Sequence, residues 1–129
     1  MVERGEDFSK HVRRITDGHG VDAVIDNVGS PVFEQARRSI ADDGRIVLVG
    51  QLTGEFLWVN PAQLFLRNVS ILSAKGVSRA QLADSLDLVA RKLIKPAVDR
   101  VLPLEGAAEA HRLVEAGLST GRLVLNPTL

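Results

Sequence analysis

The segment VDAVIDNVGSPVFEQARRSIADDGRIVLVG, residues 21–50, decides the fold. It begins with a short apolar run, Val21–Asp26, which ends at the turn-forming residue Asn27. A second apolar run, Arg45–Val49, lies near its end. Neither run alternates apolar with polar residues, which is typical of parallel strands that are covered on both faces. The segment therefore predicts two strands of one parallel sheet.

The residues between the two runs predict one helix. Ser30 is a candidate cap because its side-chain oxygen can accept a free backbone N–H. Pro31 suits the first helical position because it has no N–H to lose. Phe33, Ala36 and Ile40 then fall on one helical face. Two strands joined by a single helix form a crossover that is normally right-handed, with parallel strands.

Helices and strands also alternate on both sides of this segment. In chain order, we expect a helix capped by Asp7 and ended by Gly18, a strand Val69–Ala74, a helix from Ser78 to just before Pro96, a strand Val98–Val101, a helix Leu104–Ala116 and a strand Arg122–Asn126. Such alternation indicates an α/β domain.

The helix that follows Ser78 has the clearest pattern. Ser78 and Gln81 have the spacing of a capping box. Apolar side chains then repeat at helical spacing, which predicts one buried stripe made of Leu82, Leu86, Val89 and Leu93. The charged residues between them are expected to be exposed: Asp84, Asp87, Arg91 and Lys92.

Composition narrows the class of protein. The chain has 129 residues, 45% of them hydrophobic, which is enough for one domain with a core. Lys and Arg together number 16, as do Asp and Glu, so the formal net charge is zero. The net charge therefore gives no reason to expect binding to nucleic acid or to an anionic membrane. There is no cysteine, which excludes disulfides, thiolate metal sites and a thiol nucleophile. No apolar run is long enough for a membrane span and the N-terminus has no secretory signal, so we expect a cytoplasmic protein.

Five segments in a fixed order resemble the medium-chain dehydrogenase/reductase superfamily: VDAVIDNVG, DDGRIVLVG, LFLRNVSILSAKG, KPAVDRVLPLEGAAEAHRLVEAG and GRLVLNP. The chain is most similar to the zinc-free quinone reductases and their alcohol dehydrogenase relatives, within the zinc-binding dehydrogenase family. The resemblance extends from about Glu6 to Pro127. Members of the superfamily are normally more than twice as long, so the resemblance implies a truncated, C-terminal portion.

The implied fold is α/β: a partial Rossmann-like, three-layer domain with the second half of a doubly wound parallel sheet, followed by C-terminal helix and strand segments. We expect one domain over residues 1–129, with a cofactor-domain part at about 7–95. The segment 96–129 returns to the catalytic domain in relatives. Here its two strands are expected either to pair with each other or to lie loose.

The glycine-rich phosphate loop of this fold is not expected in the chain. Gly18, Gly20 and Ala23 match the spacing G-x-G-x-x-G/A. However, they follow a predicted helix and lead into a strand, whereas the dinucleotide motif follows a strand and opens a helix. Under the resemblance, the phosphate loop belongs to a part of the family architecture upstream of Met1.

The ends of the three strands are the candidate cofactor site. Ligands of open parallel sheets bind beyond the carboxyl ends of the strands. The resemblance implies that the nicotinamide end of NAD or NADP is lined by three pairs of residues: Asn27 and Val28, Gly50 and Gln51, and Ala74 and Lys75. A basic residue at the position of Arg122 can reach the cofactor phosphates in relatives. The alternative is that these are ordinary turn and surface residues, since Asp, Asn and Gly end strands in every α/β protein.

No catalytic residue and no metal site is expected. His11, His19 and His111 lie in separate predicted elements, no cysteine joins them, and no HExxH motif exists. Asp42 and Asp43 are adjacent and could suggest paired carboxylates. However, they lie in a predicted tight turn before Gly44, so we expect both carboxylates to be solvated rather than catalytic. The resemblance implies that the catalytic domain lies outside the chain.

Three functional interpretations stay open. In the first, the chain is the cofactor-domain portion of an NAD(P)-dependent oxidoreductase that acts on a quinone, enone or alcohol. In isolation it is then expected not to bind the cofactor tightly, not to bind zinc and not to be active. In the second, it is a non-enzymatic association module that pairs with itself or with a separately encoded N-terminal half. In the third, it is an inactive remnant. The resemblance also implies a homodimer through the edge strand Val69–Ala74. Substrate and the choice between NAD and NADP stay open, because the residue that reads the ribose follows a strand outside the chain.

Overall fold

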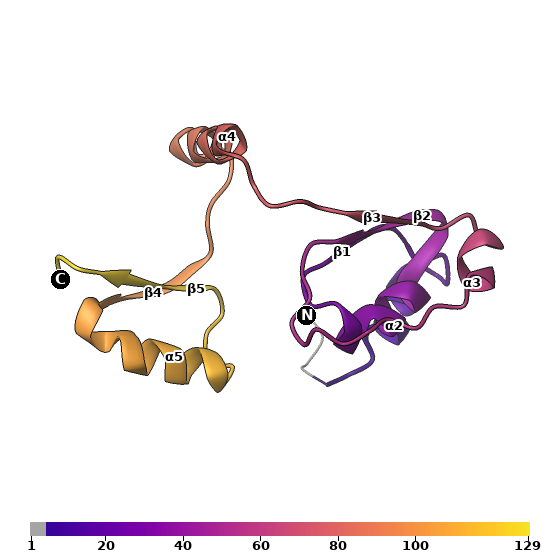
Figure 1. The fold of residues 1–129 in the computed structure, drawn as a ribbon, viewed down its shortest axis with the longest axis horizontal. Coiled ribbons are helices and arrows are strands. Elements are labelled where there is room, and N and C mark those ends of the chain that lie inside the picture. Colours follow the sequence, from indigo (N-terminus) through magenta and orange to yellow (C-terminus); the bar gives the residue numbers. More distant parts are fainter. Residues whose placement is uncertain (1–4) are drawn as a thin grey trace. The chain divides into compact units, whose positions relative to one another are not determined.

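The computed structural model describes residues 5–129, which divide after Gly76 into two compact units (Figure 1). Each unit is described by itself. The single-domain organisation expected from the sequence stays a prediction. None of the helices within residues 5–129 is long and apolar enough to cross a bilayer.

The first unit contains a three-stranded parallel sheet in the order β1-β2-β3. Its elements in chain order are α1 (Phe8–Ile15), β1 (Val21–Asp26), α2 (Ser30–Ser39), β2 (Ile40–Leu48), α3 (Ala62–Phe65) and β3 (Ser70–Ser73). Helix α2 joins β1 to β2, and α1 packs against α2. The predicted α/β fold with parallel strands is confirmed.

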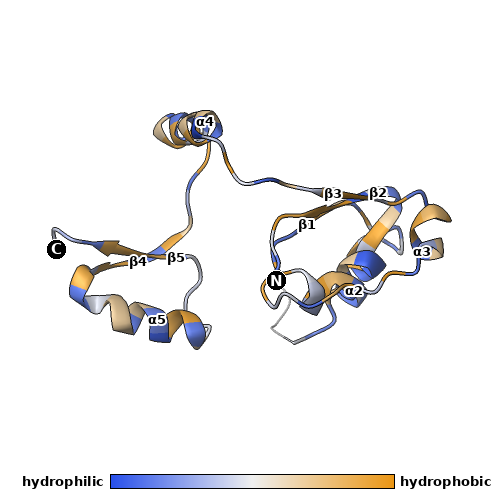
Figure 2. Cartoon of the chain, in the orientation of Figure 1, coloured by the Kyte–Doolittle hydropathy of each residue, from blue (hydrophilic) through white to orange (hydrophobic). Residues whose placement is uncertain are grey.

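Hydrophobic residues run along all three strands (Figure 2). The core lies between the sheet and α2, where Phe33, Ile40 and Ile46 are buried. Val24 packs against this cluster, whereas its neighbour Ile25 points to the opposite face and is 71% exposed. Within the described residues of this unit, therefore, helices cover one face of the sheet rather than the two that the sequence suggested.

Strand β2 begins five residues earlier than expected. Val21 pairs with Ile40 but Ala23 pairs with Arg45, so the register shifts between these pairs. The extra residues form a bulge that includes Asp43, whose φ is 60°. The bulge is held from the turn that follows α3, since Arg67 Nε donates to Asp42 Oδ1 over 2.7 Å and Asn68 Nδ2 donates to Asp43 Oδ1 over 2.6 Å.

The second unit contains α4 (Arg79–Ala90), β4 (Val98–Pro103), a 3₁₀ turn (Leu104–Gly106), α5 (Ala107–Glu115) and β5 (Arg122–Asn126). Strands β4 and β5 form a parallel pair, so of the two arrangements expected for them, pairing is the one observed. Ala110 and Leu113 of α5 are buried.

Helix α4 has the predicted cap but not the predicted burial. Ser78 Oγ accepts from Gln81 N, and Gln81 Oε1 accepts from Ser78 N, which confirms the capping box. The prediction of a buried stripe is wrong: Leu82 is 54% exposed, Leu86 60% and Leu93 59%, and only Val89 is half-buried. The physical reason is that no other helix or strand of residues 77–129 packs extensively against α4.

Candidate crevice at the strand ends

The carboxyl ends of β1, β2 and β3 meet at one edge of the first unit, because the strands are parallel. Backbone hydrogen bonds tie these ends together: Gly50 N donates to Asp26 O over 3.3 Å, Leu52 N to Val28 O over 3.0 Å, and Ala74 N to Leu48 O over 2.9 Å. The structure thus brings Asn27, Val28, Gly50, Gln51, Ala74 and Lys75 to the same edge. Their role in cofactor binding stays a prediction.

Two glycines allow the chain to pack closely at this edge. A Cβ atom on Gly50 would lie 2.6 Å from the carbonyl oxygen of Asn27. Gly29 has φ of +83°, and a Cβ there would lie 2.1 Å from Gln51 Oε1. No real Cβ contact is that short, so a side chain at Gly50 would push the two strand ends apart, and one at Gly29 would displace the Gln51 side chain.

A cavity of about 340 Å³ opens here, and we call it the strand-end crevice. Its lining residues are Gly29, Leu48, Val49, Gly50, Gln51 and Leu57. The lining is mostly backbone and aliphatic side chains, which suits a flat ring more than a charged group.

Asp26 fixes the turn beneath the crevice. Its side chain is buried, and its Oδ1 accepts from Val28 N over 2.9 Å and from Gly29 N over 2.8 Å. Its Oδ2 has no hydrogen-bond partner among residues 5–129. In the sequence Asp26 was only a strand-ending residue, and nothing in the pattern showed that it would be buried.

The start of α2 is capped by Gln51 rather than by Ser30. The structural N-cap is Gly29, and Ser30 is the first helical residue, so the predicted Ser30 cap is wrong by one position. Ser30 N donates to Gln51 Oε1 over 3.0 Å, and Gln51 Nε2 donates to the carbonyl oxygen of Glu55 over 2.7 Å. We call this arrangement the Gln51 cap. A capping residue 21 positions away in sequence leaves no local signal.

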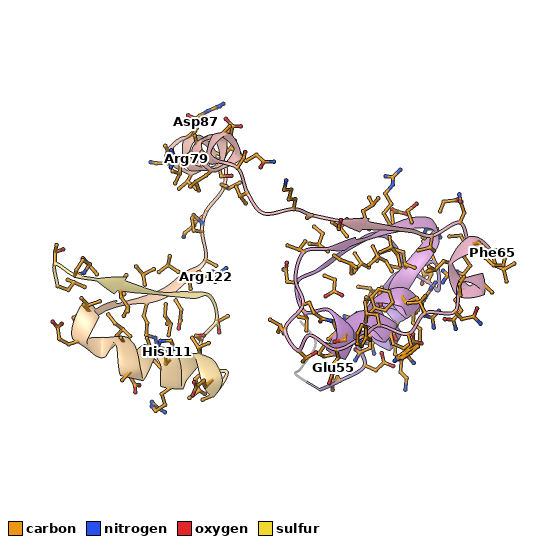
Figure 3. The ribbon with its side chains drawn as sticks, in the orientation of Figure 1. Glu55, Phe65, Arg79, Asp87, His111 and Arg122 are labelled. Atoms are coloured by element: carbon orange, nitrogen blue, oxygen red, sulfur yellow. The ribbon has the colours of Figure 1, made fainter. Side chains whose placement is uncertain are left out.

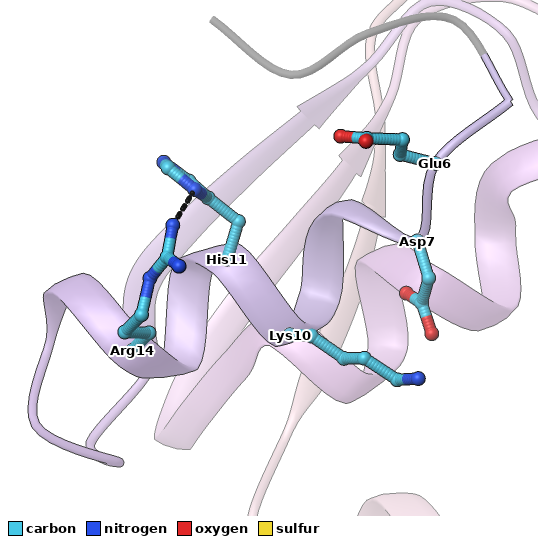
Figure 4. A pocket seen from close by; sticks show the side chains of 5 residues that line it. All are labelled: Glu6, Asp7, Lys10, His11 and Arg14. Carbon is cyan, nitrogen blue, oxygen red and sulfur yellow. Dashed lines mark hydrogen bonds between the residues drawn. The ribbon is translucent and has the colours of Figure 1, made fainter.

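A larger cavity, of about 460 Å³, lies along α1 (Figure 4). Its lining residues are Glu6, Asp7, Lys10, His11 and Arg14. Two of its polar side chains have partners on α1: Arg14 Nη2 lies 2.8 Å from His11 Nδ1, and Asp7 caps α1 by accepting from Ser9 N. The Ser9 hydroxyl holds the pKa of Asp7 below its usual value. No strand end or predicted site residue reaches this cavity, so we do not assign the cofactor to it.

The remaining predicted site residue, Arg122, lies in the second unit at the start of β5 and is exposed (Figure 3). Its backbone N–H donates to the carbonyl oxygen of Ala97 over 2.7 Å. Gly18 and Gly20 lie between α1 and β1, which confirms that the glycine spacing there is not a phosphate loop. Among residues 5–129, no three His, Asp or Glu side chains are grouped so that they could hold a metal ion.

Comparison with protein-family models gives one match, to the family described as zinc-binding dehydrogenase, over residues 3–125. The chain belongs to this family. The chain has no cysteine, and among residues 5–129 no group of His, Asp and Glu could hold a metal ion, so the absence of zinc stays a prediction.

Individual relatives agree with this assignment. Bovine quinone oxidoreductase-like protein 2 is 34% identical over 89% of this chain and 36% of its own length. The crystal structure of an NAD-dependent alcohol dehydrogenase is 40% identical, with a TM-score of 0.79 over 93% of this chain and 35% of that one. A mycobacterial protein solved in complex with NADPH is 28% identical, with a TM-score of 0.73 over 98% of this chain and 42% of that one. The chain thus spans about a third of the length of its dehydrogenase relatives.

Proposed function

We propose that this chain supplies the nicotinamide side of an NAD(P) site in a medium-chain oxidoreductase that moves hydride to or from a quinone, enone or alcohol. The observation that carries the proposal is the strand-end crevice, which lies at the carboxyl ends of parallel strands and is lined mostly by glycine backbone and aliphatic side chains. NAD(P) supplies the hydride chemistry when bound. The chain's own contribution is to position a flat ring against β1 and β2 and to shield one side of it from water.

We further propose that the isolated chain does not hold the cofactor tightly. Dinucleotide sites gain much of their affinity from the pyrophosphate, which binds backbone N–H groups at a glycine-rich helix N-terminus after a strand. The one helix that directly follows a strand end at this edge is α2, and its first N–H is taken by Gln51. Losing two charge-assisted hydrogen bonds at roughly 1.5–3 kcal/mol each weakens binding by about two to four powers of ten.

Calorimetric titration of the purified chain with NADH and NADPH tests this, beside a quinone reduction assay. We expect dissociation constants near or beyond the millimolar range and no steady turnover. A low-micromolar constant, or turnover by chain that is free of host reductases, contradicts the proposal.

A second candidate function, association with another polypeptide, is supported by the sheet itself. Among residues 5–129, no strand pairs with the outer edge of β1 or of β3. Open edges of apolar strands favour addition of a further strand. We propose a cytoplasmic homodimer through β3, or pairing with a separately encoded N-terminal half. Co-expression with such a half tests the latter: a stable complex with quinone reductase activity supports it, and failure to co-purify contradicts it.

A further inference from the structure

Residues 56–59, with the sequence FLWV, lie between β2 and α3 and belong to no helix or strand. We call them the aromatic segment. Their side chains alternate in direction, as they do in an extended strand. Leu57 and Val59 pack against the core between the sheet and α2, whereas Phe56 is 88% exposed and Trp58 93% exposed. Two neighbouring aromatic side chains on one exposed face form a contiguous apolar surface of the kind that marks interaction sites.

The backbone of the aromatic segment is also unpaired. Among residues 5–129, no hydrogen bond uses a backbone N–H or C=O group of residues 56–59. The chain on either side is held, since Gln51 Nε2 donates to the carbonyl oxygen of Glu55 over 2.7 Å and Gln63 N donates to that of Asn60 over 2.9 Å. A segment that is held in place, docked on one face and free along its backbone can pair with a strand of another polypeptide.

The aromatic segment borders the same core as the edge strand β3. Ile71 is the register partner of Ile46, and register partners on neighbouring strands point to the same face of a sheet. Ile46 belongs to the core cluster that Leu57 and Val59 contact. Val69, the residue before β3, packs against this cluster as well. The partly exposed Ile71 and the aromatic segment are therefore on the same side of the sheet.

The area of this surface suits a second copy of the chain. A specific dimer buries about 1,000 Å² or more in total. β3 has only four residues, so its edge alone offers little area. Burying Phe56 and Trp58 of two copies adds roughly 600–1,000 Å², at about 150–250 Å² for each aromatic side chain. The aromatic segment and the edge of β3 together therefore reach the size that a stable dimer needs.

Resting on the homodimer proposed above, we propose that the aromatic segment is a second contact of that dimer and pairs antiparallel with the aromatic segment of the other copy. A two-fold axis maps the segment onto itself, so the contact is self-complementary. The pairing gives partners to backbone groups along one side of the segment. It also brings Phe56 and Trp58 of each copy beside those of the other, where aromatic rings pack favourably edge to face or offset.

Trp58 fluorescence tests the proposal, because Trp58 is the only tryptophan and the chain has no tyrosine. The signal therefore reports on the aromatic segment alone. The full chain is followed from low to high micromolar concentration by sedimentation velocity, by Trp58 emission and by acrylamide quenching. We expect the emission to move to shorter wavelength, and the quenching to decrease, over the concentrations at which the dimer forms.

The variant Phe56→Ser should weaken the dimer by at least about tenfold, as expected when a buried aromatic side chain is removed from an interface. Because Phe56 is exposed within the chain, circular dichroism should show an unchanged fold. Phe65→Ser is the matched control, since it removes the same type of side chain from α3, where Phe65 is 68% exposed (Figure 3). The control should leave the dimer dissociation constant unchanged.

A dimer that forms without any change in Trp58 emission or quenching overturns this inference and leaves the homodimer through β3 standing. Equal weakening of the dimer by Phe56→Ser and Phe65→Ser also overturns it, because association would then depend on exposed apolar area in general. A chain that stays monomeric at high micromolar concentration contradicts the homodimer itself, and the inference with it.

Discussion

At the scale of single residues, the contact between Gly29 and Gln51 holds the candidate site in shape. Gly18 and Gly29 provide a matched comparison, because their φ values are +84° and +83°. A Cβ on Gly18 would meet nothing within 4 Å, whereas one on Gly29 would meet the Gln51 side chain and, at 3.1 Å, its Cα atom. Gly29 also has ψ of −133°, outside the left-handed helical region, so its backbone is one that essentially only glycine adopts.

We predict that Gly29→Ala lowers the free energy of unfolding by at least about 1 kcal/mol more than Gly18→Ala does. Both variants carry the cost of a side chain at positive φ, so the difference reports the displaced Gln51 cap together with the extra backbone strain at the ψ of Gly29. Urea melts of the two variants measure it. Equal losses in the free energy of unfolding would mean that displacing the Gln51 cap does not measurably destabilise the fold.

The pair Glu34–Arg37 predicts a pH dependence. Arg37 Nε donates to Glu34 Oε2 over 2.8 Å, and this hydrogen bond holds the pKa of Glu34 below its usual value. A carboxyl whose pKa is lowered in the folded state stabilises the fold above its unfolded pKa, and this contribution is lost as the pH falls through its folded pKa. Because the Glu34 side chain is 58% exposed, we expect less than about 1 kcal/mol.

Glu34→Gln should therefore reduce stability at pH 7 and have little effect near pH 3, below the usual pKa of a glutamate at about 4.3. Denaturant melts at the two pH values measure this, with Glu115→Gln at the exposed C-terminal end of α5 as the control. A Glu34→Gln effect that is the same at both pH values would show that the ion pair does not contribute.

At the scale of elements, α4 and α5 differ in burial although both carry apolar stripes. Leu113 of α5 is 6% exposed, whereas Leu86 of α4 is 60% exposed. We predict that Leu113→Ala lowers the free energy of unfolding by about 2–5 kcal/mol and Leu86→Ala by less than about 1 kcal/mol. Chemical denaturation of both variants decides this. A large loss for Leu86→Ala would show that α4 is covered in solution, as its sequence pattern suggested.

The elements also show what sequence can and cannot predict. The bounds of β1 and β5 were predicted to the residue, because β-branched runs are closed by Asn or Pro. The start of β2 was missed, since the bulge at Asp42 depends on Arg67, 25 residues away. The strand-end residues of the site were predicted as a group, but the Gln51 cap and the burial of Asp26 were not, because each depends on contacts made only after folding.

At the scale of the whole molecule, the open edge of β3 bears on self-association. Ala74 N donates to β2, and alternate N–H groups of a strand point to opposite sides, so the N–H of Ile71 points to the outer edge. Ile71 is 37% exposed and Leu72 48%. The outer edge of β3 therefore has a backbone N–H that can donate to another strand, and it carries apolar side chains.

We predict a dimer at high micromolar concentration and its loss in Ile71→Pro, which removes only an outward N–H. Leu72→Pro is the comparison, since it removes an N–H that points to β2 and should also destabilise the fold. Sedimentation velocity gives the assembly state, and circular dichroism confirms folding. A chain that stays monomeric at these concentrations contradicts the prediction.

The central claim is that the nicotinamide side of the cofactor lies against the ends of β1, β2 and β3. Titration of the isotope-labelled chain with NADPH, followed by amide NMR, tests it most directly, because weak binding still shifts the signals of contacting residues. We predict that the largest shifts fall on Asn27–Gly29, Gly50–Gln51 and Ala74–Lys75. Shifts confined to the cavity along α1, or no shifts at NADPH concentrations about tenfold above the millimolar range, would contradict the claim.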